Sequence, residues 1–442
     1  MKKQYLFKSL IILIISLFLL TGCGGFDPYS ILPEGIFPAT PGVESTEPPE
    51  IPETDQGVSH TQTPTPTPPQ VINIWLPPTF DPESGSAAGR LLKERLQSFQ
   101  AQHSDVQIQV RIKAPSGQGG MIDSLSTANA AAPLAVPSIV LLSQNELETA
   151  ALKGLVCSLD DMTTLMKGED WYPFAKQMGQ IQDKVFGVPI AADAMLLVYR
   201  PENLSGPKNS WQELIELNQP ILFPASDPNA LFTLNMYLSN SGEINNEQNK
   251  PMLDAESLEE VLLYYADASI FGAFPYWLTQ FENDDQIWQD YREQNANICI
   301  TWTSRYLSEL PADSVAAPLK ELFSNQPHTL VTGWSWAISE SNPTKQEISV
   351  QLIEYLSEPE YLANWTSTSG YLPTRPSSIQ SMENPTIRWL LSEIALSGKP
   401  LPSNDVLFAL GPILKSVTIQ TLKQQTDPAQ AAQDAAKQLN PP

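Results

Sequence analysis

The chain has 442 residues, of which 42% are hydrophobic, so it has enough length and apolar content to bury more than one core. Its 49 acidic residues outnumber 25 basic ones, and the formal net charge of −24 argues against a nucleic-acid-binding protein, because phosphate contacts need clustered Lys and Arg. The three histidines lie far apart and only three cysteines are present, so the sequence predicts neither a metal site nor a bound cofactor.

Residues 1–22 are predicted to form a secretory signal. Three lysines precede an apolar stretch at residues 10–20, which is too short to span a bilayer. The stretch ends in Leu-Thr-Gly followed by Cys23, so it resembles the signal of a bacterial lipoprotein. This resemblance implies that Cys23 is acylated and anchors the protein to the extracytoplasmic face of the cell membrane. The alternative is an ordinary signal peptide with an incidental cysteine.

A lipid-anchored linker is predicted over residues 23–70. Residues 24–70 contain 11 prolines, several of them in a Thr-Pro repeat, and lack the periodic apolar residues from which a core is built. Two interpretations fit this composition: a spacer that lifts a globular body off the membrane, and a disordered leader without a selected length.

Residues 71–152 alternate apolar strand patterns with amphipathic helix patterns. Apolar strands separated by helices indicate an α/β fold with a mainly parallel sheet. The expected elements in this part are strand 71–76, a helix with Leu92, Leu96 and Phe99 on one face, strand 106–112, helix 120–131, strand 139–142 and helix 145–152.

The body from residue 71 to 442 exceeds the usual size of a single core, which suggests two lobes. Its later part continues with strands and helices and ends in a mainly helical third. The expected elements are strands 183–190 and 194–199, helices 211–217, 231–239 and 258–271, strands 297–302 and 329–339, and a helix over 406–421.

Two cysteines, Cys157 and Cys299, lie in this body. They are expected to be two buried thiols. A single disulfide in an oxidising compartment is the alternative.

In open α/β sheets, ligands bind beyond the carboxyl ends of the strands, where the chain turns into the next helix. Polar and aromatic side chains follow several of the predicted strands, and no set of them has the arrangement of a catalytic site. The residues at these strand ends are Phe80, Gln144, Asn145, Asp193, Trp302 and Thr303.

Short motifs follow one another in a fixed order along the chain. They are residues 136–160, which resemble a P-D-V-V … G-L-L-x-P-L-D stretch, 185–193 (V-Y-G-L-P), 199–204 (Y-N-K-D-L-F), 211–214 (T-W-D-E-L), 333–339 (a second hinge segment) and 370–375 (G-x-L-P-T-R). As an ordered set they resemble the motifs of family 1 extracellular solute-binding proteins, which include the maltodextrin-binding protein and serve ABC importers.

Three features depart from the family pattern. Ser138 stands where an aspartate is common, and Arg200 replaces the usual asparagine before the K-D step. Residues 206–275 match little beyond 211–214. Because this stretch often contacts the ligand in the family, the ligand's identity stays open.

The resemblance implies a periplasmic-binding-protein-like α/β fold with a helical C-terminal part, in which two lobes joined by hinge strands close on a ligand. One lobe would comprise about residues 71–191 and 337–371, and the other about 195–330 and 373–442. The resemblance also implies a monomer that binds a mono- or oligosaccharide without altering it and passes it to the permease subunits of an ABC transporter.

Sugars present apolar ring faces and rims of hydroxyls, so their sites combine aromatic and short polar side chains. Trp302, Trp334 and Tyr371 are the stacking candidates, with core packing as the alternative for each. For Asp193 the alternatives are an ion pair with Arg375 or the capping of a turn, and for Arg375 the alternative is a structural ion pair. The full expected set is Phe80, Gln144, Asn145, Asp193, Tyr237, Trp277, Trp302, Thr303, Trp334, Ser335, Tyr371 and Arg375.

Other functions stay open beside carbohydrate uptake. A member of this family can bind a non-sugar solute, or act as a sensor or structural lipoprotein without transport. A surface enzyme that cleaves glycans would need two carboxylates about 5–10 Å apart across a cleft, and no motif pairs the acids in this way.

Overall fold

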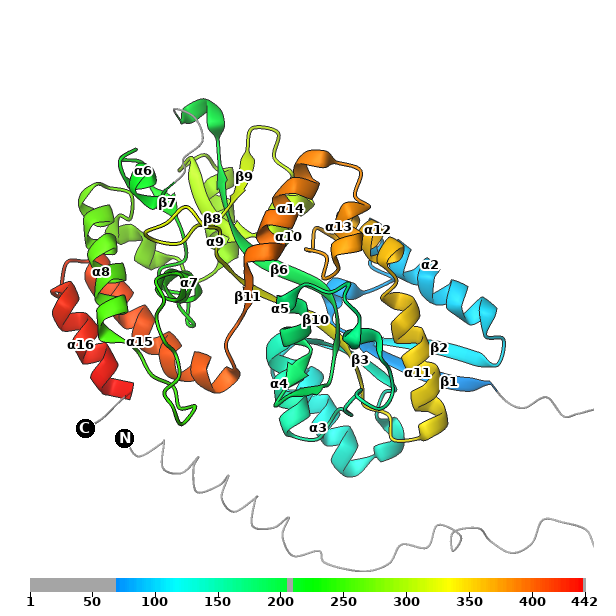
Figure 1. Cartoon of the computed structure of the whole chain (residues 1–442). Helices are drawn as coiled ribbons and strands as arrows, with labels where there is room; N and C mark the ends of the chain where they lie inside the picture. The colour runs from blue at the N-terminus through cyan, green and yellow to red at the C-terminus, as the bar shows by residue number, and fades with distance from the viewer. Residues whose placement is uncertain (1–68, 205–209, 440–442) are drawn as a thin grey trace, which may run out of the picture. The chain divides into compact units, whose positions relative to one another are not determined.

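The computed structural model describes residues 69–204 and 210–439, so the predicted signal, Cys23 and most of the linker lie outside the described residues. Residues 66–442 cluster as one compact unit. The described part of this unit is a mixed α/β structure built on one large sheet (Figure 1).

Within the described residues, the large sheet has nine strands in the order β2-β1-β3-β10-β6-β8-β7, with β11 paired to β10 and β9 paired to β6. β1 pairs in parallel with β2 and β3, as the alternation of strands and helices predicts, whereas β10 runs antiparallel to β3 and β6. The strands are β1 Gln70–Leu76, β2 Val106–Ile112, β3 Ile139–Ser143, β6 Val188–Tyr199, β7 Ile221–Leu222, β8 Ile298–Trp302, β9 Val315–Pro318, β10 Thr329–Ile338 and β11 Gly398–Pro400.

One sequence expectation, two separate strands over 183–190 and 194–199, is wrong. The chain first forms a short hairpin, β4 (Gln180–Ile181) with β5 (Lys184–Val185), and β6 then runs without a break. The polar Asp193, which interrupts the apolar pattern, continues the ladder to β10. From Met195 onward β6 pairs with β8 and β9 instead, so β6 and β10 connect the two ends of the sheet.

The first half of the fold comprises β1–β3 and the helices packed around them. Helix α2 (Ala87–Gln102) begins at Ser86, whose hydroxyl accepts a hydrogen bond from Gly89 N at 2.9 Å. As predicted, its apolar face is buried against the sheet. The other helices of this half are α3 Met121–Ala131, α4 Gln144–Leu152, α5 Pro173–Met178, α11 Pro343–Leu356, α12 Pro359–Ser369 and α13 Pro376–Gln380.

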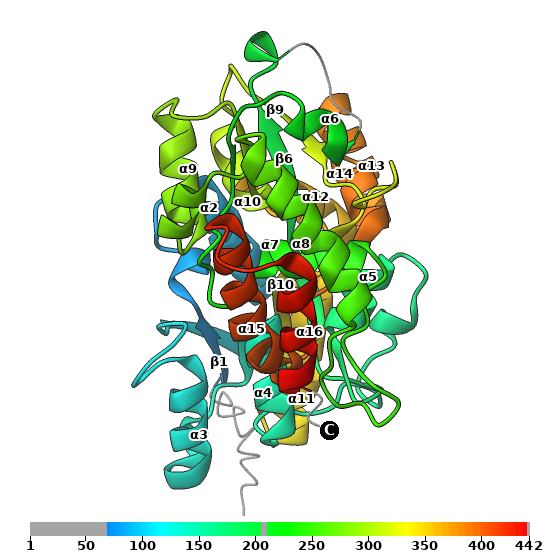
Figure 2. The same ribbon diagram turned by 90° about the vertical axis from the view of Figure 1, so that its left-hand side faces the viewer.

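The second half comprises β7–β9 and a helical layer in which α7, α8, α15 and α16 pack together (Figure 2). Its core is rich in aromatic rings, such as Phe223 and Phe232 with centroids 4.6 Å apart. Helix α15 is the one described helix that is long and apolar enough to cross a membrane, and half of its apolar window is buried in this core. The helices are α6 Trp211–Ile215, α7 Leu231–Ser239, α8 Ala255–Ile270, α9 Asp284–Arg292, α10 Thr303–Glu309, α14 Pro385–Ser397, α15 Asn404–Leu422 and α16 Pro428–Leu439.

Cys157 and Cys299 are free thiols, the favoured of the two sequence alternatives. Cys299 is fully buried in β8, where burial raises the pKa of its thiol. Cys157 is partly buried beside Gln346 and Glu340. Neither cysteine therefore cross-links the two halves.

Candidate ligand-binding cleft at the crossing strands

In the middle of β6 and β10, several side chains lie on the same side of the sheet and form one continuous surface. Side chains alternate along a strand, so Asp193 and Met195 lie on the same side of β6. Trp334 of β10 lies on that side too, because it pairs with Ala191, two residues before Asp193. Next to it, a Cβ on Gly333 would lie 2.3 Å from the Ala191 carbonyl oxygen, so only glycine lets the two strands approach this closely.

An aromatic cluster of Phe80, Trp334, Trp365 and Tyr371 stands on this surface. Phe80 follows β1, and its ring centroid is 5.2 Å from that of Trp334 and 5.6 Å from that of Tyr371. Phe80 and Trp365 are buried, whereas Trp334 and Tyr371 stay partly exposed. Segments that are far apart in the sequence thus place two partly exposed rings over a buried aromatic base, an arrangement suited to the apolar face of a ligand.

Asp193 caps the first turn of α10. Its carboxylate accepts hydrogen bonds from Thr303 Oγ1 at 2.8 Å, from the Ser304 backbone N–H at 2.9 Å and from Ser304 Oγ at 2.6 Å. Thr303 Oγ1 also accepts from the Ala194 N–H, and Thr303 has no exposed surface. Thr303 therefore positions Asp193 and offers nothing to a solute itself.

Burial raises the pKa of Asp193 to about 6, although hydrogen bonds from Ser304 and Thr303 oppose the rise; the charge of Asp284 adds to it. The folded protein therefore keeps a proton on Asp193 at pH values where the unfolded chain, with a pKa of 3.8, has lost it. By linkage, the folded state gains stability from this proton at pH 4 and loses that gain as the pH rises through 6.

The variant Asp193→Asn is expected not to lose folding stability in this way as the pH rises, because its amide does not ionise. The free energy of unfolding of the variant, measured relative to wild type, should rise by about 2 kcal/mol between pH 4 and pH 7 and then level off. Urea unfolding at a series of pH values measures the difference. A difference that stays constant over this window would contradict the titration assigned to Asp193.

Trp302, at the end of β8, lines a small pocket of about 160 Å³ in the second half. Met195 of β6 pairs with Trp302 and also lines the pocket. Asp227, Glu282 and Asp284 contribute carboxylates to the same lining. The partly exposed indole thus lies beside hydrogen-bond acceptors. Because Met195 lies on the same side of β6 as Asp193, this pocket adjoins the crossing-strand surface.

These acids were missed by the sequence interpretation. The carboxylate of Asp284 accepts hydrogen bonds from Thr301 Oγ1 at 2.6 Å and from Arg305 Nε at 3.2 Å. Burial raises the pKa of Asp284 and also that of Asp227, whose carboxylate accepts from the Leu231 N–H at the start of α7. The sequence signal that could have revealed Asp227 is its position four residues before the predicted helix 231–239, where an aspartate can accept hydrogen bonds from the first turn.

Gln144 and Asn145, at the start of α4, contact the second half of the fold. Gln144 Nε2 donates to the Leu401 carbonyl oxygen at 2.8 Å, and Asn404 Nδ2 donates to the Asn145 carbonyl oxygen at 2.8 Å. The two residues therefore join α4 to the segment that leads into α15.

Tyr237 and Ser335 have no exposed surface available for a ligand in this structure. Tyr237 is 0% exposed, and its hydroxyl donates to the Glu243 carbonyl oxygen and accepts from the Asp254 N–H. Ser335 lies on the opposite side of β10 from Trp334, where it packs close to Gly187. Their placement corrects the expectation of direct ligand contact, because alternation along β10 turns Ser335 away and the core of the second half encloses Tyr237.

Arg375 forms the structural ion pair that was its alternative. Its Nε donates to Asp170 Oδ2 at 2.9 Å, and its Nη1 donates to the Ser357 carbonyl oxygen at 2.7 Å. Arg375 thus pairs with a different aspartate from the Asp193 considered in the sequence. Trp277 is partly buried and packs edge-on against Phe281, with centroids 6.0 Å apart.

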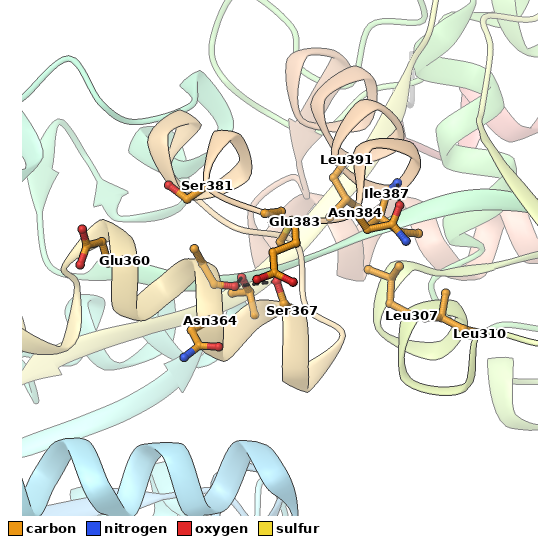
Figure 3. Close-up of a pocket in the computed structure, with 13 residues that line it drawn as sticks. Leu307, Leu310, Glu360, Asn364, Ser367, Ser381, Glu383, Asn384, Ile387 and Leu391 are labelled. Carbon is orange, nitrogen blue, oxygen red and sulfur yellow. Dashed lines mark hydrogen bonds between the residues drawn. The ribbon is translucent and has the colours of Figure 1, made fainter.

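A separate pocket of about 630 Å³ lies between α10, α12 and the start of α14 (Figure 3). Leu307, Leu310 and Ile387 line one side, and Glu360 and Asn364 of α12 lie on the other. None of the ligand residues expected from the sequence lines it. The candidate cleft is therefore the crossing-strand surface with its aromatic cluster and the pocket at Trp302.

Comparisons with known proteins bear on this geometry. Residues 94–387 match a family model described as bacterial extracellular solute-binding protein. No curated protein matches the sequence.

Solved structures of sugar-binding proteins have the same fold. Maltose-bound MalE3 of T. maritima is 17% identical with a TM-score of 0.64, and the match covers 84% of this chain and 99% of that one. The cyclic α-maltosyl-1,6-maltose binding protein from Arthrobacter globiformis is 14% identical with a TM-score of 0.70 (84% and 98% covered), and the sugar-binding protein MalE of Xanthomonas citri is 17% identical with a TM-score of 0.69 (84% and 96% covered). The chain therefore has the periplasmic-binding-protein-like fold that the motifs implied.

Proposed function

This chain belongs to the bacterial extracellular solute-binding proteins, and from that premise we propose that it captures a carbohydrate at the crossing strands and delivers it to an ABC importer. The observation that supports this proposal most directly is the placement of two partly exposed rings, Trp334 and Tyr371, over buried Phe80. The carboxylate of Asp193 lies on the same surface. Rings match the apolar faces of a sugar, and the acid matches its hydroxyls.

Ligand-driven closure is the proposed mechanism. Trp302 belongs to the second half and Phe80 to the first, and β6 and β10 run between the two. A sugar that touches both halves would stabilise the closed arrangement by the free energy of the contacts it makes only there. We propose that the two lobes that close comprise about residues 71–191 with 337–371 and about 195–330 with 373–442.

The proposed carbohydrate is neutral. Asp227, Glu282 and Asp284 line the pocket at Trp302, and Asp193 lies on the adjoining surface of β6. Arg305 is already paired with Asp284. An anionic sugar phosphate would meet these carboxylates without a free cationic partner in the described lining. Neutral mono- and oligosaccharides, like the maltose held by the T. maritima protein, avoid this cost.

Calorimetric titration of the body (residues 69–442) with a panel of neutral sugars and non-sugar solutes tests this function. We expect saturable binding of at least one sugar and recovery of that sugar unchanged. Binding of a non-sugar solute alone would contradict the carbohydrate part of the proposal, and a cleaved product would contradict its binding-only character.

The lipid anchor is a further part of the proposal, supported by the sequence around Cys23 and the proline-rich linker. More than one acyl chain on Cys23 would hold the protein at the extracytoplasmic membrane surface, near an importer. Mass spectrometry of the mature N-terminal peptide should find acylated Cys23. An unmodified cysteine would contradict the proposed lipid anchor.

A further inference from the structure

The pocket between α10, α12 and the start of α14 has the size and the lining of a small-molecule site (Figure 3). We call it the α12 pocket. Its volume of about 630 Å³ lies within the range of such sites. Ala363, Met382 and Leu391 are buried and form its base. The apolar part of the lining consists of these three residues with Leu307, Leu310 and Ile387. A ligand in the pocket can therefore bury an apolar body.

Leu310 is held at the α12 pocket in an unfavourable backbone conformation. It ends α10 with φ 41° and ψ 63°, in the left-handed region that glycine or asparagine usually occupies after a helix. Leu310 is also 49% exposed. Folding stability explains neither the strained backbone nor the exposed apolar side chain at this position. A leucine that offers apolar surface to a ligand explains both.

The charge of the α12 pocket is negative. Glu360 lies on α12 and Glu383 lies just before α14, with its side chain directed toward α12 (Figure 3). Neither carboxylate has a hydrogen bond or an ion pair among the described residues, and the described lining contains no lysine or arginine. An anionic ligand would be repelled, whereas a cation gains two unpaired carboxylates as partners.

Helix α10 connects the α12 pocket to the crossing strands. At its first turn, Ser304 Oγ donates to Asp193 at 2.6 Å, and at its other end Leu307 and Leu310 line the pocket. The backbones of α10 and α12 also touch, because a Cβ on Gly370 would lie 2.9 Å from the Ser304 carbonyl oxygen. A ligand that wedges between these two helices thus acts on the helix that holds Asp193.

We propose that the α12 pocket binds an organic ammonium ion with an apolar body. The ammonium group donates hydrogen bonds to the carboxylates of Glu360 and Glu383, and the apolar body packs against Leu310 and the base of the pocket. The α12 pocket shares no lining residue with the pocket at Trp302. A second part of this proposal rests on the proposed carbohydrate binding: through α10, the ammonium ion and the sugar change each other's affinity by the same factor.

Calorimetric titration of residues 69–442 with n-hexylammonium chloride at pH 7 tests the site. The matched probes are 1-hexanol, which has the same apolar body without the charge, and methylammonium, which has the charge without the body. We expect saturable binding of hexylammonium, and binding of the other two that is weaker by about tenfold or more. Equal affinities for hexylammonium and hexanol would overturn the assignment to a cation. No binding of hexylammonium would overturn the site.

Variants locate the hexylammonium ion in the α12 pocket. Leu310→Asn should weaken its binding by about tenfold and leave the urea midpoint of unfolding unchanged or higher, because asparagine tolerates the left-handed conformation. The Glu360→Gln and Glu383→Gln double variant should weaken hexylammonium binding about tenfold and leave hexanol binding unchanged. Glu347→Gln and Leu396→Ala, at exposed residues outside the pocket lining, are the controls and should keep the wild-type affinity.

Two results would contradict the location. A lower urea midpoint in Leu310→Asn would show that this leucine serves folding, and equal losses in the glutamate double variant and Glu347→Gln would show attraction by the net charge of the chain.

Sugar titrations with and without saturating hexylammonium test the second part. We expect the sugar affinity to change, and the hexylammonium affinity to change by the same factor when the sugar is saturating. Unchanged affinities would overturn the coupling through α10. An absence of binding by every sugar would overturn the proposed carbohydrate function, while the hexylammonium titrations would still decide the site.

Discussion

Replacing Trp302 and Trp334 together by alanine is expected to weaken sugar binding by about a hundredfold or more, with each single variant losing about tenfold. The two partly exposed indoles come from β8 and β10, on the same side of β6 as Asp193 and Met195. Each substitution removes an aromatic surface on which a sugar ring can stack, and no neighbouring ring at that strand replaces it. Calorimetric titration with a sugar that wild type binds measures the loss.

Trp389→Ala is the matched control for these variants. Trp389 is 59% exposed on α14 and does not line the pocket at Trp302. Its removal should leave the sugar affinity unchanged. Wild-type affinity in the double variant, with the fold intact, would show that the sugar binds somewhere other than the crossing strands.

Arg200→Met is expected to lower the free energy of unfolding by about 2–4 kcal/mol. Arg200 is 5% exposed at the end of β6, where Nη1 and Nη2 donate to the Ala296 and Tyr291 carbonyl oxygens, each at 2.9 Å. Its guanidinium also lies 4.0 Å from the centroid of the Tyr291 ring. Methionine fills similar space but leaves both carbonyl groups without this donor. Urea unfolding measures the change.

Two variants separate the buried hydrogen bonds of Arg200 from its ion pair. Arg200 Nε donates to Asp313 at 2.6 Å, but the Asp313 side chain is 47% exposed, so Asp313→Ala should cost less than 1 kcal/mol. Arg292→Met, at an ion-paired arginine whose side chain is 50% exposed, should cost a similarly small amount. Equal losses in Arg200→Met and Asp313→Ala would contradict this explanation.

The sequence predicted strands and helices best where one physical signal dominated. The period-two alternation at 106–112 and the apolar run at 139–142 gave β2 and β3 almost to the residue. The break in β6 was predicted wrongly because Asp193 looked like the end of a strand. Its partners, the side chains of Thr303 and Ser304, come from more than 100 residues away and cannot be seen in the local pattern.

The candidate site was only partly predictable for the same reason. Strand ends and motifs pointed to Phe80, Trp334 and Tyr371, which the fold brings into one cluster. Residue type alone also selected Tyr237, whose hydroxyl is used inside the core. Asp227 was missed because it comes to lie beside Trp302 only when the turn before α7 and the end of β8 meet in the folded chain.

Small-angle scattering of residues 69–442 with and without a saturating sugar tests the central claim, closure of the two halves on a carbohydrate, most directly. Ligand-driven closure predicts a smaller radius of gyration for wild type when the sugar is bound, and no contraction for the Trp302→Ala and Trp334→Ala double variant. An unchanged radius of gyration in wild type, at a sugar concentration where calorimetry reports full occupancy, would contradict it.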